Sequence, residues 1–121
     1  FPALAQLSLR ANRLAAVTLV HPTLTALDLS VNPLADHAAA VAGCPGLTHL
    51  DLANTGLTDA ALARVLAALP NLRSLNVAWN PLADHAALLA HPKLEALDLT
   101  GTRVGRRGAK ALAARFGTIG L

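Results

Sequence analysis

The residues best suited to bind a metal ion or transfer protons form a repeated Asp-His pair. Residues 32–39 and 80–87 share the sequence Asn-Pro-Leu-Ala-Asp-His-Ala-Ala. If the two copies belong to units of a repeated fold that lie two strands apart, His37 and His85 are about 10 Å apart. Zinc ligands lie about 2 Å from the metal, so these side chains cannot share one ion. The pair therefore indicates the first turn of a repeated structural unit.

The remaining candidate catalytic side chains also have a structural interpretation. Cys44 is the only cysteine, and its apolar setting before Pro45 favours a buried, inert thiol. His21 and His91 hold the same position before a proline as Cys44 does. The chain contains no phosphate-binding loop, Gly-x-Ser-x-Gly elbow or His-Glu-x-x-His motif. We therefore expect no catalytic residue, metal or cofactor, and no enzymatic activity in this chain.

The elements that position these residues follow from one pattern that occurs five times. It reads Pro-x-Leu-x-x-Leu-x-Leu/Val-x-x-Asn/Thr-x-Leu/Val, and its successive copies are 20, 23, 25 and 22 residues apart. Five of the seven prolines hold one position of the pattern, and the other two, Pro33 and Pro81, are equivalent to each other. The first leucines of the five copies are Leu4, Leu24, Leu47, Leu72 and Leu94. Such a period is typical of a solenoid built from stacked units.

Each unit divides into a strand, a turn and a return segment. The Leu-x-Leu core alternates with a period of two, which predicts a short strand with leucines inward and the intervening residues outward. The Asn or Thr three positions later can bond backbone groups in the turn. The longer return segments predict helices, such as one over residues 60–69, with Asp36, Asp59 and Asp84 as N-caps. The short return over residues 15–21 predicts an extended or single-turn connection.

These units resemble leucine-rich repeats. Residues 56–61 (Gly-Leu-Thr-Asp-Ala-Ala) and 108–113 (Gly-Ala-Lys-Ala-Leu-Ala) are similar to the ribonuclease-inhibitor-like subtype and to the Gly-Ala-x-x-Leu-Ala repeats of type III effectors from plant-pathogenic bacteria. The resemblance implies an α/β leucine-rich-repeat solenoid, a short right-handed superhelix with a parallel sheet on its concave face and helices and turns on its convex face. Such effectors often join their repeats to a catalytic domain, which this chain lacks.

The pattern predicts a single domain of 1–121 that is a fragment of a longer protein. Phe1 already lies within a repeat, and the last six residues align loosely with the start of a sixth unit, so they form either that unit or a cap. We expect truncation. The predicted units are 2–21, 22–44, 45–69, 70–91, 92–115 and the partial segment 116–121.

Outward strand residues form columns across the predicted sheet, and these columns give the candidate binding site. One column contains three aspartates, which either receive basic side chains of a partner or are merely solvated. Trp79 stands where equivalent residues are small or medium-sized, so it is either an interface anchor or packs on the neighbouring repeat. The predicted partner-binding residues are Trp79, Asp28, Asp51, Asn76, Asp98, His49, Asn54 and Arg73.

Positive charge is concentrated near the C-terminal end. Residues 1–102 contain five basic and seven acidic side chains, whereas residues 103–121 contain five basic side chains and no acidic one. This basic patch could contact an adjoining domain, an acidic partner or an anionic membrane surface. The alternative is that it is the solvated face of an ordinary helix. The absence of nearby stacking aromatics disfavours nucleic acid. The patch comprises Arg103, Arg106, Arg107, Lys110 and Arg115.

The sequence therefore predicts a soluble protein-recognition module that binds a partner protein, such as a host target or an adjoining domain, on its concave face. As a bacterial effector it would be secreted into the host cytoplasm, and otherwise it would be cytoplasmic. One alternative is that the repeats select substrates for a catalytic domain outside this chain. Another is that they act as a structural spacer or an intramolecular docking surface.

Overall fold

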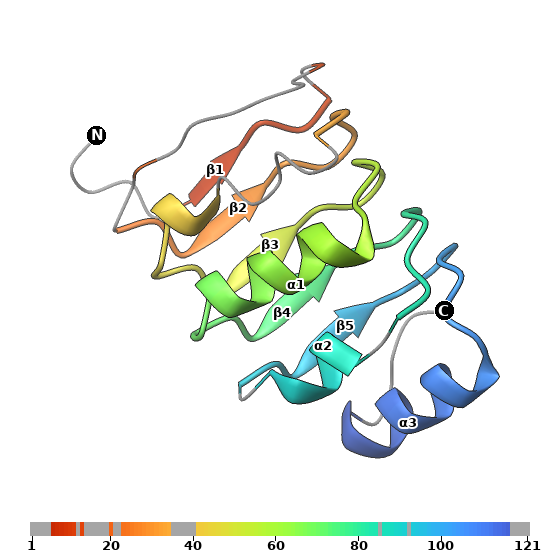
Figure 1. Cartoon of the computed structure of the whole chain (residues 1–121). Helices are drawn as coiled ribbons and strands as arrows, with labels where there is room; N and C mark the ends of the chain where they lie inside the picture. The colour runs from red at the N-terminus through yellow and green to blue at the C-terminus, as the bar shows by residue number, and fades with distance from the viewer. Residues whose placement is uncertain are drawn as a thin grey trace.

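The computed structural model describes residues 6–11, 13, 20, 23–34, 41–84, 86–91 and 93–116. Within these residues, short parallel strands form one sheet in chain order (Figure 1). The strands are β1 (Gln6–Ser8), β2 (Ala26–Asp28), β3 (His49–Asp51), β4 (Ser74–Asn76) and β5 (Ala96–Asp98). This order confirms the predicted leucine-rich-repeat solenoid with a parallel sheet.

The central leucine of each strand sets the register of the sheet. Leu7, Leu27, Leu50, Leu75 and Leu97 pair in succession without offset. The last four are buried, together with the leucine or valine two positions later in each unit. Burying one such side chain contributes roughly 1.5–3 kcal/mol, so stacking equivalent leucines stabilises each unit against the next.

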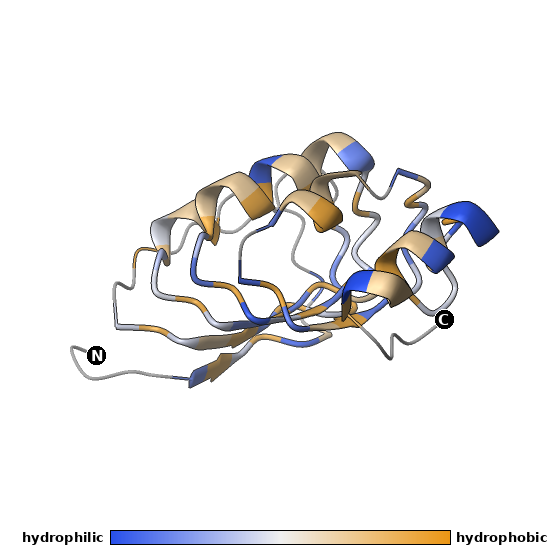
Figure 2. Ribbon diagram, turned by 90° about the horizontal axis from the view of Figure 1, so that it is seen from below, coloured by the Kyte–Doolittle hydropathy of each residue, from blue (hydrophilic) through white to orange (hydrophobic). Residues whose placement is uncertain are grey.

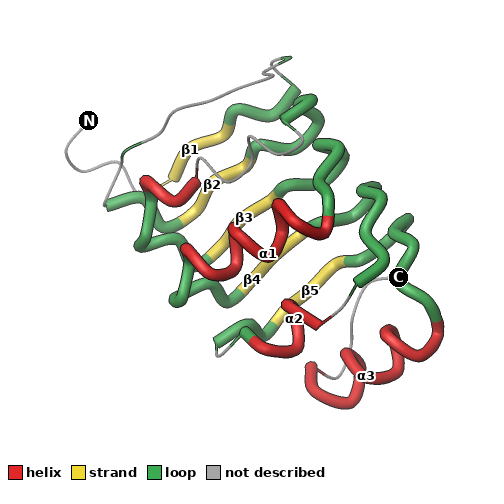
Figure 3. The backbone as a smooth tube through the Cα atoms, viewed as in Figure 1, coloured by secondary structure: helices red, strands yellow, loops and turns green. Residues whose placement is uncertain are grey.

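Helices cover one face of the sheet, and Figure 2 shows the sheet and the helices as two layers. They are α1 (Asp59–Ala68), α2 (Ala86–Ala90) and α3 (Arg106–Phe116). Helix α1 contacts α2, and α2 contacts α3. Residues 41–43 form a single 3₁₀ turn on the same side, and loops make up much of the remaining described chain (Figure 3). We use "concave face" below for the sheet face opposite these helices.

One predicted helix cap is wrong by one residue. Thr58, not Asp59, is the N-cap of α1, and its hydroxyl accepts a hydrogen bond from the backbone N–H of Ala61 at 3.3 Å. The Asp59 carboxylate instead accepts hydrogen bonds from the backbone N–H groups of Ala83 and Asp84 in the next unit. The helix consequently spans residues 59–68 instead of 60–69. Asp84 does accept from the N–H of Ala86, the first residue of α2, at 2.9 Å.

Several predictions fall on residues outside the described part of the chain. They concern Asp36, His37, His85, His21, the short return over residues 15–21 apart from Val20, and the C-terminal residues 117–121.

A buried asparagine joins neighbouring units where the chain leaves the sheet. Asn80 is 1% exposed, and its Oδ1 accepts hydrogen bonds from the backbone N–H groups of Thr55 and Leu57, each at 3.0 Å. Its Nδ2 donates to the carbonyl oxygens of Leu52 and Val77, each at 2.9 Å. One side chain therefore satisfies backbone groups of two units, which confirms the predicted role of this position.

Candidate protein-binding face

The register of the sheet places the residues of the predicted acidic column side by side on neighbouring strands. Asp28 pairs with Asp51 on the next strand, Asp51 with Asn76, and Asn76 with Asp98. Neighbouring strands lie about 4.8 Å apart, so the four side chains form a row roughly 14 Å long across the concave face. All four residues are partly buried.

Each member of this row also stabilises a turn, a role that strand alternation does not predict. The Oδ1 atoms of Asp28, Asp51 and Asp98 accept hydrogen bonds from the backbone N–H two residues later, at 2.9 Å in each case. Asn76 makes the same bond to the N–H of Ala78 at 3.0 Å. These are Asx-turns, in which an Asp or Asn side chain replaces a backbone acceptor. The turn requires the carbonyl-type oxygen but not the negative charge.

The carboxylates of the row form no ion pair within the described residues. The one ion pair there joins Arg73 and Glu95, and none involves Asp28, Asp51 or Asp98. Burial raises the pKa of the Asp51 carboxyl above its ordinary value, and the negative charges of Asp28 and Asp98 raise it further. The hydrogen bond from the N–H of Ala53 and the positive charge of Arg10 act in the opposite direction. The row is therefore a strip of incompletely compensated negative charge.

Trp79 stands beside this strip with 64% of its surface exposed. Its backbone is left-handed, with φ of 60°, and Val31, Asn54 and Gly101 at equivalent positions also have positive φ. The indole ring lies against the backbone of Gly101, where an added Cβ atom would overlap it. Trp79 thus packs on the neighbouring unit and still presents most of its surface, and its role as an interface anchor stays a prediction.

The concave face contains two adjoining hollows. The larger, about 560 Å³, lies over strands β1 to β4 and is lined by residues that include His49 and Asp51. The smaller, about 280 Å³, lies where the strands end and is lined by residues that include Trp79, Asp51 and Asp98. Asp51 and Asn76 line both hollows, so the two form one continuous groove, which we call the concave groove. The row and the indole ring therefore face one surface.

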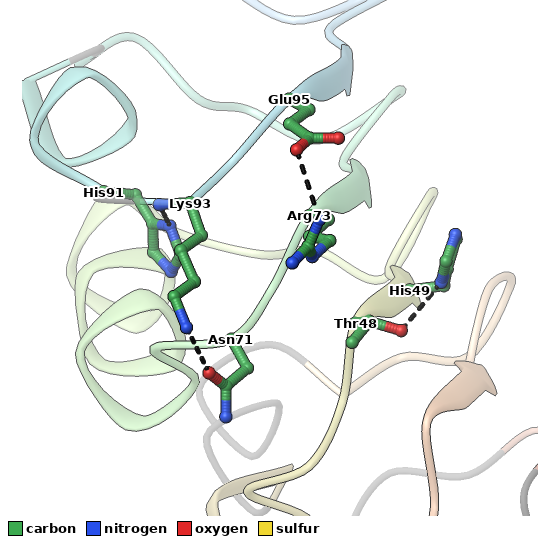
Figure 4. Close-up of polar contacts among 7 residues, drawn as sticks. All are labelled: Thr48, His49, Asn71, Arg73, His91, Lys93 and Glu95. Atoms are coloured by element: carbon green, nitrogen blue, oxygen red, sulfur yellow. Dashed lines mark hydrogen bonds and ion pairs between the residues drawn. The ribbon is translucent and has the colours of Figure 1, made fainter.

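The remaining predicted residues lie around this groove. Figure 4 shows Arg73, which pairs with Glu95 at 3.4 Å, and His49, whose Nδ1 lies 2.9 Å from the Thr48 hydroxyl oxygen. His49 lines the larger hollow, whereas Arg73 lines neither hollow and Asn54 lies in the turn after β3. The structure thus groups Trp79, the three aspartates, Asn76 and His49 in one groove and leaves Arg73 and Asn54 beside it.

His91, a buried histidine outside the concave groove, has a structural role. His91 is 4% exposed, its Nε2 lies 2.7 Å from the carbonyl oxygen of Leu69, and its Nδ1 lies 3.3 Å from the backbone nitrogen of Lys93. Both ring nitrogens therefore bond the backbone, and Figure 4 shows the bond with Lys93. Cys44, at the equivalent position, is fully buried, as the sequence predicts.

The predicted basic patch divides into two parts. Arg115 donates hydrogen bonds to the carbonyl oxygens of Leu88, Leu89 and His91, and its guanidinium lies 4.6 Å from the centre of the Phe116 ring. It thereby joins α3 to the C-terminal end of α2, where a positive charge is favourable. The other members, Arg103, Arg106, Arg107 and Lys110, are exposed.

Neither a metal cluster nor a membrane-spanning helix is found among the described residues. No group of three or more His, Cys, Asp or Glu side chains in that part of the chain is arranged to hold a metal ion. None of its helices is long and apolar enough to cross a bilayer.

Comparisons with known proteins agree with this geometry. A comparison with curated proteins finds no significant match. A solved structure of internalin C2 from Listeria monocytogenes is similar, with a TM-score of 0.72 and 20% identity over 99% of this chain and 51% of that one. An internalin F structure from the same organism has a TM-score of 0.62 and 17% identity over 83% of this chain and 28% of that one. This chain thus spans about half the length of the internalin C2 chain and less than a third of the internalin F chain.

The match to a family of known sequences is independent of these structures. The family described as leucine-rich repeat matches residues 20–39, 43–64, 68–87 and 90–113, which together make up more than half of the chain. These segments contain strands β2 to β5. The chain therefore belongs to the leucine-rich repeat family.

Proposed function

We propose that this chain is a protein-recognition module that binds a partner protein in the concave groove. The observation that carries the proposal is Trp79, an indole that is 64% exposed beside partly buried polar side chains. Exposed tryptophans fixed on a rigid surface are frequent interface anchors, because they bury a large area at little entropic cost. Packing against Gly101 fixes one side of this ring before any partner binds.

The experiment that tests this proposal is affinity capture with the chain as bait, followed by quantitative mass spectrometry of the bound proteins. The anchor variant is Trp79→Asn, because Asn54 shows that asparagine accepts the same left-handed backbone. The strip variant is Asp51→Arg, and the matched control is Arg64→Ala on the exposed side of α1.

We expect a specific partner to be captured by the wild-type chain and by the Arg64→Ala control. Its recovery should decrease at least about tenfold with Trp79→Asn and with Asp51→Arg, as for removal of an interface anchor or reversal of a central charge. Circular dichroism of each bait checks its fold. Equal recovery by two folded variants would refute binding in the concave groove.

A second candidate function is docking through the basic end of the solenoid. It is favoured by the exposed cations of α3 and its N-terminal loop, namely Arg103, Arg106, Arg107 and Lys110. Arg106 and Arg107 begin the helix, where the helix dipole disfavours positive charge by a few tenths of a kcal/mol. In this role the chain would be a spacer or contact an adjoining domain or an anionic surface. Replacing both arginines by glutamate should then abolish that contact at low salt.

The wider setting that we propose is the recognition domain of a bacterial effector. Its support is the resemblance of residues 56–61 and 108–113 to the repeats of type III effectors. Within a larger effector enzyme, the same groove would select the substrate for a separate catalytic domain. Sequencing the complete reading frame tests both versions, since it would reveal a secretion signal or a catalytic motif beside residues 1–121.

A further inference from the structure

We propose that the occupant of the concave groove is an extended, arginine-bearing segment of the partner that crosses the strands, with one guanidinium against Trp79 and Asp98 and a second over Asp28 and Asp51. This inference rests on the proposed function and adds the chemistry of the partner. It depends on three features of the groove: its charge, its aromatic wall and the spacing between its carboxylates.

The charge of the groove favours a cation over any other group. One oxygen of each aspartate in the row bonds its own turn, and the described residues offer the row no ion pair. Arg10 is the basic side chain that lines the groove, and its charge acts on Asp51 without forming an ion pair. It follows β1, so it lies four strands and roughly 19 Å from Asp98 on β5. Burial is the main cause of the raised pKa of Asp51, and the repulsion from Asp28 and Asp98 that adds to it would be relieved by a cation bound over the row.

The aromatic wall favours arginine over lysine. Trp79 and Asp98 both line the smaller hollow, so a cation there can contact an indole face and a carboxylate together. A planar guanidinium stacks on an aromatic ring while its N–H groups remain directed at a carboxylate, whereas an ammonium is a strongly hydrated point charge.

The spacing between carboxylates sets the spacing between the two arginines. Asp28 and Asp51 lie on adjacent strands, and Asp98 lies two strands beyond Asp51. At about 4.8 Å per strand, a cation between the first two is roughly 12 Å from a cation at Asp98. An extended chain advances about 3.3 Å per residue, so arginines four residues apart match this distance. Asn76 lies between them in the row and supplies a neutral polar contact.

The sheet itself supplies variants that change charge without breaking a turn. Asn76 makes the same Asx-turn as the aspartates, so Asp28→Asn, Asp51→Asn and Asp98→Asn retain the turn acceptor and remove the charge. The reverse change, Asn76→Asp, adds a fourth carboxylate to the row. A matched control is Asp59→Asn, because Asp59 lies on α1 and lines neither hollow.

The test is a titration with the blocked peptide acetyl-Gly-Ser-Arg-Gly-Ser-Gly-Arg-Ser-Gly-amide at low salt. Trp79 is the only tryptophan and the chain has no tyrosine, so intrinsic fluorescence reports on the smaller hollow alone. We expect saturable binding that the triple aspartate-to-asparagine variant weakens about tenfold and Asn76→Asp strengthens a few fold, with Asp59→Asn unchanged. A peptide with glutamine in place of both arginines should not bind. Because the net charge of the chain is +3, nonspecific attraction would not produce this pattern.

Two results would overturn the inference: no saturable binding of the arginine peptide to the wild-type chain, or equal binding to the folded triple variant. The proposed function would fail separately. If the peptide does not bind while Trp79→Asn still abolishes capture of a protein partner, the groove is a binding site for a segment of different chemistry. If the arginine peptide binds as expected and Trp79→Asn leaves protein capture unchanged, the captured protein binds elsewhere.

Discussion

Replacement of Asn80 by alanine should be one of the most destabilising single changes to a polar residue of this chain. The variant removes the acceptor of the Thr55 and Leu57 N–H groups and the Nδ2 donor of the Val77 carbonyl oxygen. The Leu52 carbonyl oxygen keeps a second donor in the hydroxyl of Thr55. Three backbone groups thus lose the partner that the side chain supplies.

The expected cost follows from this count. A buried polar group that loses its partner costs about 1–3 kcal/mol, so three such groups, taken in the lower half of that range, should decrease the free energy of unfolding by about 3–5 kcal/mol. That is a large part of the roughly 5–15 kcal/mol of a typical domain. Asn80→Thr should lose less, because the Thr102 hydroxyl, at the equivalent position, bonds the carbonyl oxygen of Leu99 at 2.8 Å. Threonine would thus satisfy Val77 but not the two N–H groups of the previous unit.

Urea denaturation followed by far-ultraviolet circular dichroism measures these differences. The control is Asn71→Ala, because Asn71 is exposed and its contact with Lys93 lies at the surface; we expect a change within about 0.5 kcal/mol. If Asn80→Ala lost less than about 1 kcal/mol, or if Asn80→Thr were as stable as the wild type, the inter-unit bonds would not hold the solenoid together as argued.

Three further predictions concern the groove and the last helix. The raised pKa of Asp51 means that the folded state holds its proton more tightly than the unfolded state, so this residue reduces stability as pH rises through that pKa. Asp51→Asn should therefore be more stable than the wild type at pH 7 and indistinguishable below pH ~3, where both side chains are neutral; denaturation at both pH values decides this. Gly101→Ala should displace the Trp79 ring and strain a backbone with φ of 72°, with a cost of about 1–2 kcal/mol and an altered tryptophan emission maximum; an unchanged spectrum would contradict the packing described. Arg115→Ala should lower stability by about 1 kcal/mol, while Arg107→Ala on the same helix should have little effect; equal melting temperatures would refute the role of Arg115 in joining α3 to α2.

The sheet and its register could be predicted from the sequence, because one spacing recurs in every unit. Equivalent leucines must occupy equivalent positions, and the observed pairing of Leu27 with Leu50 and of Leu50 with Leu75 follows directly. The outward columns are predictable for the same reason, since a strand alternates its two faces. The repeat spacing alone thus suffices to place Asp28 and Asp51 side by side.

The local role of these aspartates could not be obtained from the strand pattern alone. Their turns depend on backbone conformation after the strand, which alternation does not describe. A usable sequence signal was present, because an Asp or Asn two residues before a small residue recurs at Asp51 and Asn76. The start of α1 was misassigned for a related reason: Thr58 and Asp59 are both good N-cap residues, and composition alone does not choose between neighbours.

The sequence predicts which residue lies beside Trp79 but not how its side chain is oriented. The column places it beside Gly101, and a glycine with no side chain leaves room for a large neighbour. How much of the indole remains exposed depends on its rotamer, which a column does not specify.

The most direct test of partner binding in the concave groove is an NMR titration of the ¹⁵N-labelled chain with its captured, unlabelled partner. The indole N–H of Trp79 gives a resonance of its own, because the chain has one tryptophan. We predict that this resonance and the amides of Ala53 and Ala78 in the smaller hollow shift on binding, while the amides on the exposed side of α1 do not. Shifts confined to α1 and α3, with an unchanged indole resonance, would contradict partner binding in the concave groove.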